Sequence, residues 1–520
     1  MSSGRIKQKS MFLVSNSIFI TAILVVIQIM IWGGFYYLLT NQFASQYAVL
    51  FQFLVAALTI SMISYVVLRC PHNSYQIAWL ILLALMPTVA LIMYAILRIV
   101  PGTSHLIAQL DERALATDLH LVDSEMARRD LAMMDNRYVG LFRYLSAGCK
   151  YPTYYAPEVT YYSIGDKALE AMFADLEKAE KFIFMEYFIV SEGEIIERLL
   201  EILERKVKEG VEVRFMYDGF CTLKLPHEFK ERIERIGVQC AVFSPLRPII
   251  SSYQNNRDHR KITVIDGKVA YTGGFNLADE YANLITRFGY WKDAGIRITG
   301  NGVQSFTAMF LQVWGVATGM KSDAYAHYMA VEENPGYDGA IVAPYADAPE
   351  NARDTASDVY CQILDLAEDY VHIMTPYLIL DERLRRSIEF AAERGVDVKI
   401  FLPHIPDKKI VFMIARSYYP ELLKTGIKIY EYTPGFLHSK VFVSDDCISS
   451  VGTINLDFRS LFLHFENSLL VYDENVARSI EKDFEETQAI SERIYLKTYC
   501  EFPWYKRAFG RLMRVFGPLM

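Results

Sequence analysis

Two short runs of this 520-residue chain carry the same reactive side chains at the same spacing. Each reads His-x-Lys, four residues and Asp: His259, Lys261 and Asp266 in the first, and His438, Lys440 and Asp445 in the second. After six further residues each run has a glycine, and three residues later an asparagine: Gly273 and Asn276, then Gly452 and Asn455. The second run begins 179 residues after the first, so the chemistry is present twice.

The spacing predicts how these groups act together. Residues two apart in a strand point to one face, so each imidazole lies beside its ammonium group. Asp266-Gly267 favours a hairpin turn that brings Asn276 back towards the same end. Two such sets about a pseudo-twofold axis suit one phosphodiester, because ammonium and amide donors bind phosphate oxygens and a histidine on each side permits in-line displacement.

A single His-x-Lys pair has a simpler interpretation, a surface histidine beside a solvated lysine. A repeat has no structural need to copy that pair, so the double occurrence indicates a functional site that uses both pairs. The aspartates are more ambiguous. Asp266 and Asp445 are either chemical groups or turn formers.

The surrounding elements also recur. A buried strand, an amphipathic helix, a glycine stop and a second strand form a βαβ unit in each half. The segments are 181–190, 194–208 and 211–217, then 370–379, 381–394 and 395–401. The sequence therefore predicts duplicated α/β halves, 151–335 and 336–500, joined near the turn-rich stretch Asn334–Asp338.

The N-terminal region predicts a multi-pass membrane segment. No charged residue occurs between Lys9 and Arg69, and none between Arg69 and Arg98. Residues 1–103 hold three apolar spans, about 11–38, 47–68 and 77–95, each near the 20 residues that cross a bilayer. A cleaved signal peptide fits the first span less well because the apolar run is too long. Residues 104–150 predict a helical connector.

Charge limits the function classes. The net charge of −8 divides into +5 for residues 1–100 and −13 for the remainder, and an acidic body is unsuited to non-specific nucleic-acid binding. The seven cysteines form no CxxC pair, so neither a disulfide framework nor a zinc site is indicated. By the positive-inside rule, three spans would place the large C-terminal part outside the cytoplasm, and two spans would place it inside. The side of the membrane on which it lies is therefore left open.

The last segment, 501–520, predicts a basic amphipathic helix. From Phe502 onward it carries four cations and no acid: Lys506, Arg507, Arg511 and Arg514. Such a helix lies at a membrane interface and attracts anionic lipid. The alternative is a terminal helix docked on the body.

The paired motifs resemble the phospholipase D superfamily, and the chain resembles its bacterial cardiolipin synthases over nearly the whole length. The residues that carry the likeness are 186–189, 210–219, 259–267, 271–281 and 455–460. Two N-terminal spans are common in that family, and three are predicted here. Gly274 occupies a position where many members have serine, whereas Thr453 keeps a hydroxyl in the second half.

The resemblance implies duplicated halves and a bacterial cell-membrane enzyme that transfers a phosphatidyl group between two phosphatidylglycerols, without metal or cofactor. It implies His259 as nucleophile and His438 as acid and base, and the pseudo-symmetric site leaves the reverse assignment open. The phosphate is expected to be held by Lys261, Lys440, Asn276, Asn455 and Thr453. Acids 34 and 28 residues after these histidines, Asp293 and Glu466, are expected to orient the rings of His259 and His438 respectively.

Three other functions remain open. The first is a lipid hydrolase, or a transferase that uses another alcohol. The second is a phosphodiesterase for nucleic acid, which the acidic body disfavours. The third is a membrane scaffold, which two intact His/Lys sets disfavour. The sequence does not indicate the oligomeric state.

Overall fold

The computed structural model describes residues 30, 33–34, 37, 45–69, 73–99, 103–245, 256–329, 339–349 and 353–519. The described residues form two compact units. The smaller unit contains those up to 99 together with 515–519, and the larger contains the rest. The predicted join, Asn334–Asp338, lies outside the described residues, as does most of the first predicted span.

The N-terminal unit consists of helices α2 (Ser45–Arg69), α3 (Asn73–Leu85) and α4 (Pro87–Ile99). Their contact is a small apolar core that includes Val66, Leu83 and the edge-to-face rings of Trp79 and Tyr94. Among the described residues, one helix is long and apolar enough to cross a membrane, Val49–Arg69, with a mean hydropathy of 2.1.

The third predicted span, 77–95, is not one helix. Pro87 has no N–H, and the chain there divides into α3 and α4, which have 13 residues each. Helical bonding continues around the break, because Met86 N–H donates to Leu82 and Ala90 N–H to Met86. A 13-residue helix is about 20 Å long, less than the roughly 30 Å of bilayer hydrocarbon.

The larger unit contains two β-sheets with the same strand order. The first sheet runs β2-β9-β7-β6-β3-β4-β5, and the second runs β10-β17-β16-β15-β11-β12-β13 between the edge strands β1 and β18. In each sheet, three parallel strands pair antiparallel with a hairpin that begins within the histidine motif. This hairpin is β6-β7 in the first sheet and β15-β16 in the second. The predicted duplication is therefore present in the topology.

The strand bounds in the first sheet are β2 (Val159–Tyr162), β3 (Phe182–Tyr187), β4 (Glu212–Asp218), β5 (Gln239–Phe243), β6 (Lys261–Ile265), β7 (Val269–Gly273) and β9 (Gly295–Thr299). Those in the second are β1 (Tyr154–Ala156), β10 (Ala340–Asp347), β11 (Tyr370–Met374), β12 (Asp397–Pro403), β13 (Lys428–Tyr432), β15 (Val441–Ser444), β16 (Ile448–Gly452), β17 (Glu466–Tyr472) and β18 (Ser491–Ile494). A third, two-stranded sheet pairs β8 (Tyr290–Lys292) with β14 (Gly435–Leu437).

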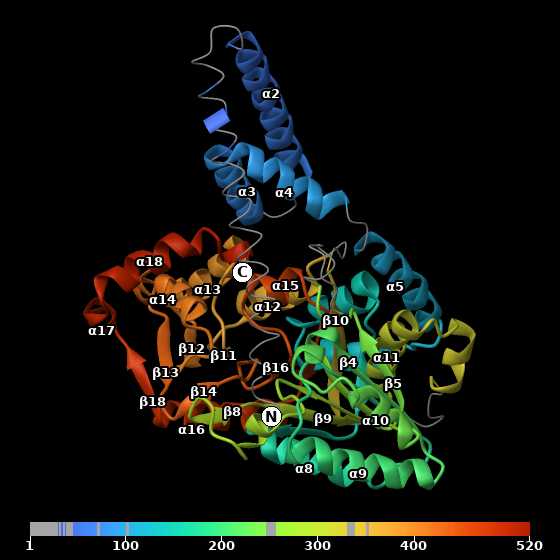
Figure 1. The fold of residues 1–520 in the computed structure, drawn as a ribbon. Coiled ribbons are helices and arrows are strands. Elements are labelled where there is room, and N and C mark those ends of the chain that lie inside the picture. The colour runs from blue at the N-terminus through green and yellow to red at the C-terminus, as the bar shows by residue number, and fades with distance from the viewer. Residues whose placement is uncertain are drawn as a thin grey trace. The chain divides into compact units, whose positions relative to one another are not determined.

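Helices cover both sheets (Figure 1). The first half contains α8 (Gly165–Leu176), α9 (Glu194–Lys208), α10 (Phe229–Arg235) and α11 (Val303–Thr318). The second contains α12 (Thr355–Leu366), α13 (Glu382–Glu393), α14 (Lys409–Lys424), α15 (Phe458–Phe462) and α16 (Glu474–Ala489). The connector forms α5 (Thr103–Asp118), α6 (Glu125–Met134) and α7 (Val139–Arg143), and the C-terminal segment forms α17 (Leu496–Glu501) and α18 (Trp504–Arg514).

The local sequence explains the matching βαβ units. Both α9 and α13 have a buried apolar face, and each is followed by a glycine with positive φ, Gly210 at 95° and Gly395 at 99°. This left-handed conformation ends the helix and turns the chain into the next strand.

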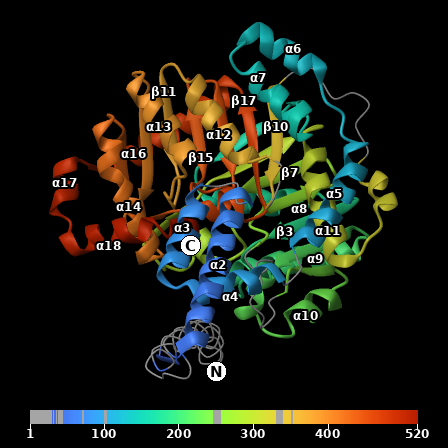
Figure 2. The ribbon, with the colours of Figure 1, turned by 90° about the horizontal axis from the view of Figure 1, so that it is seen from above.

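The two halves lie side by side in the larger unit, the first in green to yellow and the second in orange to red (Figures 1 and 2). Strands β16 and β17 of the second half pack against β7 of the first. One buried bond crosses this contact, from Asn467 Nδ2 to Thr272 Oγ1 at 2.8 Å. The two histidine motifs thus lie at the junction of the halves.

Candidate active site

The backbone at the junction exchanges partners between the halves. His259 N–H donates to the Phe465 carbonyl at 2.9 Å, and His438 N–H donates to the Lys292 carbonyl at 2.7 Å. Strand β14, which leads to His438, runs parallel to β8 of the first half. Each histidine is therefore positioned by backbone of the half to which it does not belong.

The same exchange pairs each imidazole with a carboxylate from the opposite half. His259 Nδ1 lies 2.9 Å from Glu466 Oε2, and His438 Nδ1 lies 2.6 Å from Asp293 Oδ2. The predicted pairing, Asp293 with His259 and Glu466 with His438, is wrong in its partners. The cause is the exchanged backbone. Asp293 directly follows the residue whose carbonyl binds His438, and Glu466 directly follows the residue whose carbonyl binds His259.

Both lysines contact their own histidines. Lys261 Nζ donates to the His259 carbonyl, and Lys440 Nζ donates to the His438 carbonyl. Lys440 Nζ also lies 2.9 Å from His438 Nδ1. All four side chains are almost fully buried. Because Nδ1 of each ring faces a carboxylate, Nε2 is the nitrogen left for a substrate.

Burial and neighbouring cations favour the neutral forms of both histidines and both lysines in the free site. Burial and Lys261 lower the pKa of His259 well below its ordinary value. Burial and Lys440 lower the pKa of His438 to about 4, while Asp293 opposes that shift. Burial also lowers the pKa of Lys261 to about 8 and that of Lys440 to about 7, although the nearby carboxylates favour the charged form.

The two carboxyl groups differ. Burial raises the pKa of Glu466 to about 8, although Lys261 opposes this shift. Burial also acts on Asp293, but the charges of His438 and Lys440 hold its pKa below the ordinary value. Asp293 is therefore ionised at neutral pH, whereas burial favours the protonated form of Glu466.

The two asparagines lie in buried positions after their motifs. Asn276 Oδ1 accepts a bond from Ile189 N–H at 2.9 Å, and its buried Nδ2 makes no hydrogen bond within the described residues. Asn455 Nδ2 instead donates to Ser460 Oγ at 3.0 Å. Asn276 thus has an open amide donor for a phosphate, whereas the amide of Asn455 is engaged.

Thr453 and Gly274 occupy matching positions in the two halves. The Thr453 hydroxyl donates to Glu466 and accepts from Asn467 N–H at 3.0 Å, so it contacts the carboxyl group, and its phosphate contact stays a prediction. A Cβ at Gly274 would lie 2.0 Å from Asp293 Oδ1. Serine does not fit there unless Asp293 moves, which explains the departure from the common motif.

Asp266 and Asp445 are not part of the site. Both have positive φ, 54° and 51°, in the hairpin turns that follow β6 and β15. Asp266 accepts backbone N–H bonds from residues 180–182, and Asp445 accepts them from residues 368–370. The chemical role that was one of their two predicted roles is wrong, because they fix the turns at the strand ends remote from Lys261 and Lys440.

Aromatic rings line the histidines, and the motif analysis did not identify them. His464 and Trp291 each precede a carboxylate by two residues. The His464 ring lies 5.6 Å from that of His259, and the Trp291 ring lies 5.3 Å from that of His438. A residue two before an acid shares its side in an extended strand, and this spacing is the signal that the sequence offered, although His464 itself lies in a bend before β17.

One group of side chains near the site has the spacing of a metal site. Single ligand atoms of His259, His464 and Glu466 all lie within 4.8 Å of one another. An ion bound there would occupy the imidazole of His259. The expected metal independence therefore remains a prediction.

Comparisons with known proteins agree with this architecture. The domain family described as "Cardiolipin synthase, PLD-like domain" matches residues 172–314 and 360–488, which span both motifs. The chain is 37% identical to a cardiolipin synthase of Geobacillus kaustophilus over 71% of this chain and 74% of that protein. It is 32% identical to one of Halalkalibacterium halodurans over 86% and 90% of the two chains. An uncharacterized protein of Streptococcus mutans is 48% identical over 74% and 83%.

A solved structure shares the fold. The phosphatidylserine synthase of Haemophilus influenzae matches with a TM-score of 0.55 over 71% of this chain and 95% of that one. The two chains are 14% identical, so the match supports the architecture of the paired halves.

Proposed function

Because the chain belongs to the cardiolipin synthase family of phospholipase D-like proteins, we propose that it joins two phosphatidylglycerol molecules into cardiolipin and releases glycerol. The observation that carries the proposal is the pair of buried imidazoles at one junction, each held at Nδ1 by a carboxylate of the opposite half. Two such imidazoles supply a nucleophile and an acid for one phosphodiester.

The first step forms a covalent intermediate. His259 Nε2 attacks the phosphorus of one phosphatidylglycerol, and the bond from phosphorus to the glycerol oxygen breaks. The bound phosphate anion favours the protonated ring, so His438 takes up a proton from solvent when the substrate binds. The imidazolium then gives this proton to the departing oxygen, and glycerol leaves. Asp293 stabilises the imidazolium, because the carboxylate lies 2.6 Å from Nδ1 and is ionised.

The second step resolves the intermediate. The hydroxyl of a second phosphatidylglycerol gives its proton to His438, and its oxygen attacks phosphorus. The bond from phosphorus to His259 Nε2 then breaks, which releases cardiolipin and restores both rings. The two phosphodiester bonds exchanged are alike, so the equilibrium lies near balance and responds to glycerol.

The lysines supply the charge that stabilises the phosphate. Lys261 and Lys440 are buried, and a bound phosphate anion favours their ammonium forms over the neutral amines. Asn276 Nδ2 is a further donor. Two ammonium groups supply the positive charge that Mg²⁺ provides in other phosphoryl transfers, so we expect full activity in excess EDTA.

The membrane region is also part of the proposal. Helix α2 has the length and hydropathy of a span, and we propose that the chain is a multi-pass protein of a bacterial cell membrane. We further propose the domain division 1–103, 104–150, 151–335, 336–500 and 501–520. A site near a bilayer meets a lipid alcohol at high local concentration, which favours transfer over hydrolysis.

The test is purified protein in phosphatidylglycerol vesicles, with lipids separated and free glycerol measured. We expect one glycerol per cardiolipin, no requirement for CDP-diacylglycerol, and the same rate in EDTA. Incubation of cardiolipin with excess glycerol is expected to regenerate phosphatidylglycerol. Phosphatidic acid as the main product would identify a hydrolase, and transfer to another added alcohol in preference to phosphatidylglycerol would identify a different transferase.

A further inference from the structure

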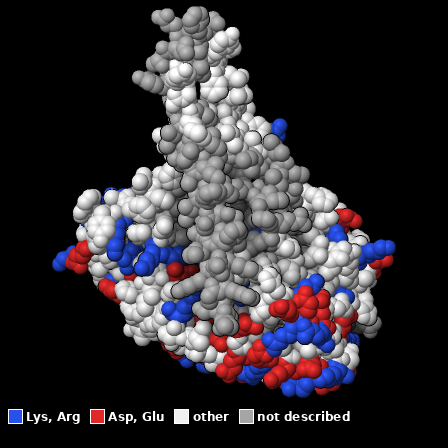
Figure 3. All heavy atoms as spheres, in the orientation of Figure 1, with Lys and Arg blue, Asp and Glu red and all other residues white. Residues whose placement is uncertain are grey.

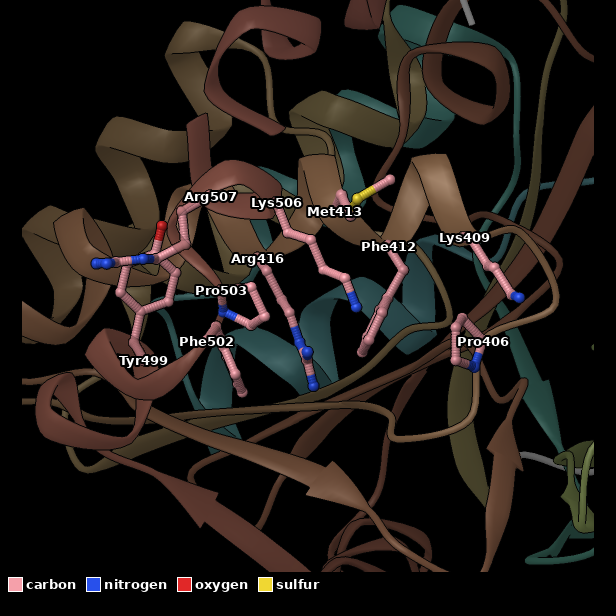
Figure 4. Close-up of a pocket in the computed structure, with 10 residues that line it drawn as sticks. All are labelled: Pro406, Lys409, Phe412, Met413, Arg416, Tyr499, Phe502, Pro503, Lys506 and Arg507. Atoms are coloured by element: carbon pink, nitrogen blue, oxygen red, sulfur yellow. The ribbon is translucent and has the colours of Figure 1, made fainter. Parts of the chain in front are cut away.

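A groove outside the active site is lined by α14 and the two C-terminal helices. It has a volume of about 340 Å³ and ten described lining residues: Pro406, Lys409, Phe412, Met413, Arg416, Tyr499, Phe502, Pro503, Lys506 and Arg507 (Figure 4). The histidines, lysines and carboxylates of the active site are not among them. None of the ten is acidic, and four carry a positive charge.

The floor and the cations of this groove are arranged for an amphiphile. The Arg416 side chain extends between Phe412 and Phe502, with its guanidinium 4.2 and 3.9 Å from the two ring centres (Figure 4). Arg416 is neutralised, because Glu431 binds it at 2.6 and 2.9 Å. The ammonium of Lys506 points into the groove beside these rings (Figure 4).

A second cation, Arg507, is only partly satisfied. Its guanidinium lies 5.7 Å from the centre of the Tyr499 ring, and its buried Nε has no hydrogen-bond partner in the described structure. Lys and Arg side chains gather over α14 and α18 on the surface as well, at the left of Figure 3. The groove thus combines aromatic walls with donors for an anion.

Helix α18 is docked with its apolar face outward. Gly510 is its buried residue, where a Cβ would lie 2.3 Å from the Met413 carbonyl, and Arg514 binds Glu421 of α14 at 2.9 and 3.0 Å. The opposite face exposes Trp504 (73%), Tyr505 (57%) and Leu512 (62%). A helix that only stabilised the body would bury these side chains.

Helix α18 is thus docked on the body, as one of its two predicted roles requires, and its outward face leaves the membrane role as a prediction. The outward aromatic and aliphatic residues are typical of a helix that lies in a membrane interface. With that face in the interface, the cations at the edge of the groove are at the level of lipid phosphates.

We propose that this groove binds an anionic phospholipid of the membrane, separately from the substrate in the active site. Lys506 and Arg507 bind the headgroup phosphate, and the first carbons of an acyl chain lie against Phe412, Met413 and Phe502. The site holds the catalytic body on anionic membrane.

The test uses the full chain with both His259→Ala and His438→Ala, so that the lipid probe is neither turned over nor transferred to a ring. The protein is reconstituted in phosphatidylcholine vesicles that contain phosphatidylglycerol with a photoactivatable diazirine on one acyl chain. We expect cross-links in the peptides with Phe412–Met413 and Phe502–Pro503. An identical probe on phosphatidylcholine is expected to leave these peptides unlabelled.

The matched variants change two charges each. Removing two cations near an anionic surface costs about fivefold in affinity for each, so K506Q/R507Q is expected to reduce groove labelling roughly 20-fold. R478Q/K482Q on α16 removes two exposed cations and is expected to have no effect. With both histidines intact, K506Q/R507Q in detergent micelles with saturating substrate is expected to keep its activity, which shows that the variant is folded.

Three results would overturn the proposal. The first is equal labelling of the groove by both probes, and the second is unchanged labelling in K506Q/R507Q. The third is disulfide cross-linking between two copies of a Met413→Cys chain, which would assign the groove to a second copy. None of these results depends on whether the enzyme makes cardiolipin.

Discussion

The two histidine–carboxylate pairs have similar geometry and different charge. His259 faces a glutamate that also binds the hydroxyl of Thr453, and His438 faces an aspartate packed against Gly274. Burial leaves a proton on Glu466, whose pKa is about 8, whereas Asp293 is ionised. Duplication therefore repeated the positions of the groups, and local packing made the two sets chemically unequal.

This difference governs when each ring can react. An ionised carboxylate accepts the Nδ1 hydrogen and leaves a lone pair on Nε2, as attack requires. A protonated Glu466 donates to Nδ1 of His259 and places the ring hydrogen on Nε2. If His259 attacks first, Glu466 must lose its proton, whereas His438 has an ionised partner throughout the neutral range.

The largest effect is expected from removing either ring. H259A and H438A should each lose about 10⁴-fold or more in rate, because nucleophile and acid act as a unit. In H438A, acid quenching and mass spectrometry of peptides should find the phosphatidyl group on His259. H327A changes an exposed histidine and serves as the control. An adduct on His438 in the H259A protein, with none on His259 in H438A, would reverse the proposed order.

The carboxylates are expected to differ in the next largest effect. D293N removes the charge that stabilises the His438 imidazolium and should lower kcat by up to about 10⁴-fold, by comparison with the aspartate of a serine protease triad. E466Q replaces a group that is already neutral at pH 7 and keeps an oxygen for Nδ1 of His259. Its loss should be about tenfold, within the range of a single hydrogen-bonding group. Equal losses in steady-state assays would show that the two pairs have the same charge in the working enzyme.

A smaller effect is expected in the pH profile. With His259 as nucleophile, kcat/KM rises as pH increases through about 8, because Glu466 then ionises. Lys440 and Lys261, with pKa values of about 7 and 8, oppose this rise when no substrate is bound. E466Q isolates the glutamate and should lack the rising limb. A wild-type profile with the same limbs as E466Q would contradict the proposed role of Glu466.

Much of the fold and the main reactive groups could be predicted from the sequence. The βαβ units are local patterns of burial, and the duplicated motif marked His259, Lys261, His438 and Lys440 without any long-range information. The structure places these four side chains at the junction of the halves, as the pseudo-twofold argument requires.

The pairing of acids with histidines could not be predicted in the same way. Linear spacing places Asp293 after His259, but the parallel contact of β8 with β14 brings that acid to His438. The packing of Gly274 against Asp293 also could not be predicted from the motif alone, since it depends on a carboxylate 19 residues later. Pro87 alone does not predict that the third span divides into α3 and α4, because packed membrane helices tolerate proline.

The smallest effect on catalysis is expected at the far ends of the motif strands, where the halves are alike. Asp266 accepts three backbone N–H bonds at 2.7–2.8 Å, and Asp445 accepts three at 2.9–3.0 Å and also binds Arg137. An asparagine turns an NH₂ group towards one of these donors. D266N and D445N should therefore each lower the free energy of unfolding by about 1 kcal/mol, the net contribution of one hydrogen bond. D445N should lose more because its ion pair is also weakened.

Thermal unfolding measures this loss, while kcat/KM of the folded protein should stay within about twofold, inside the error of additive distant sites. A loss of activity without a loss of stability would return both aspartates to the catalytic machinery, and a loss confined to one of them would show that the inequality of the two pairs extends along the whole motif.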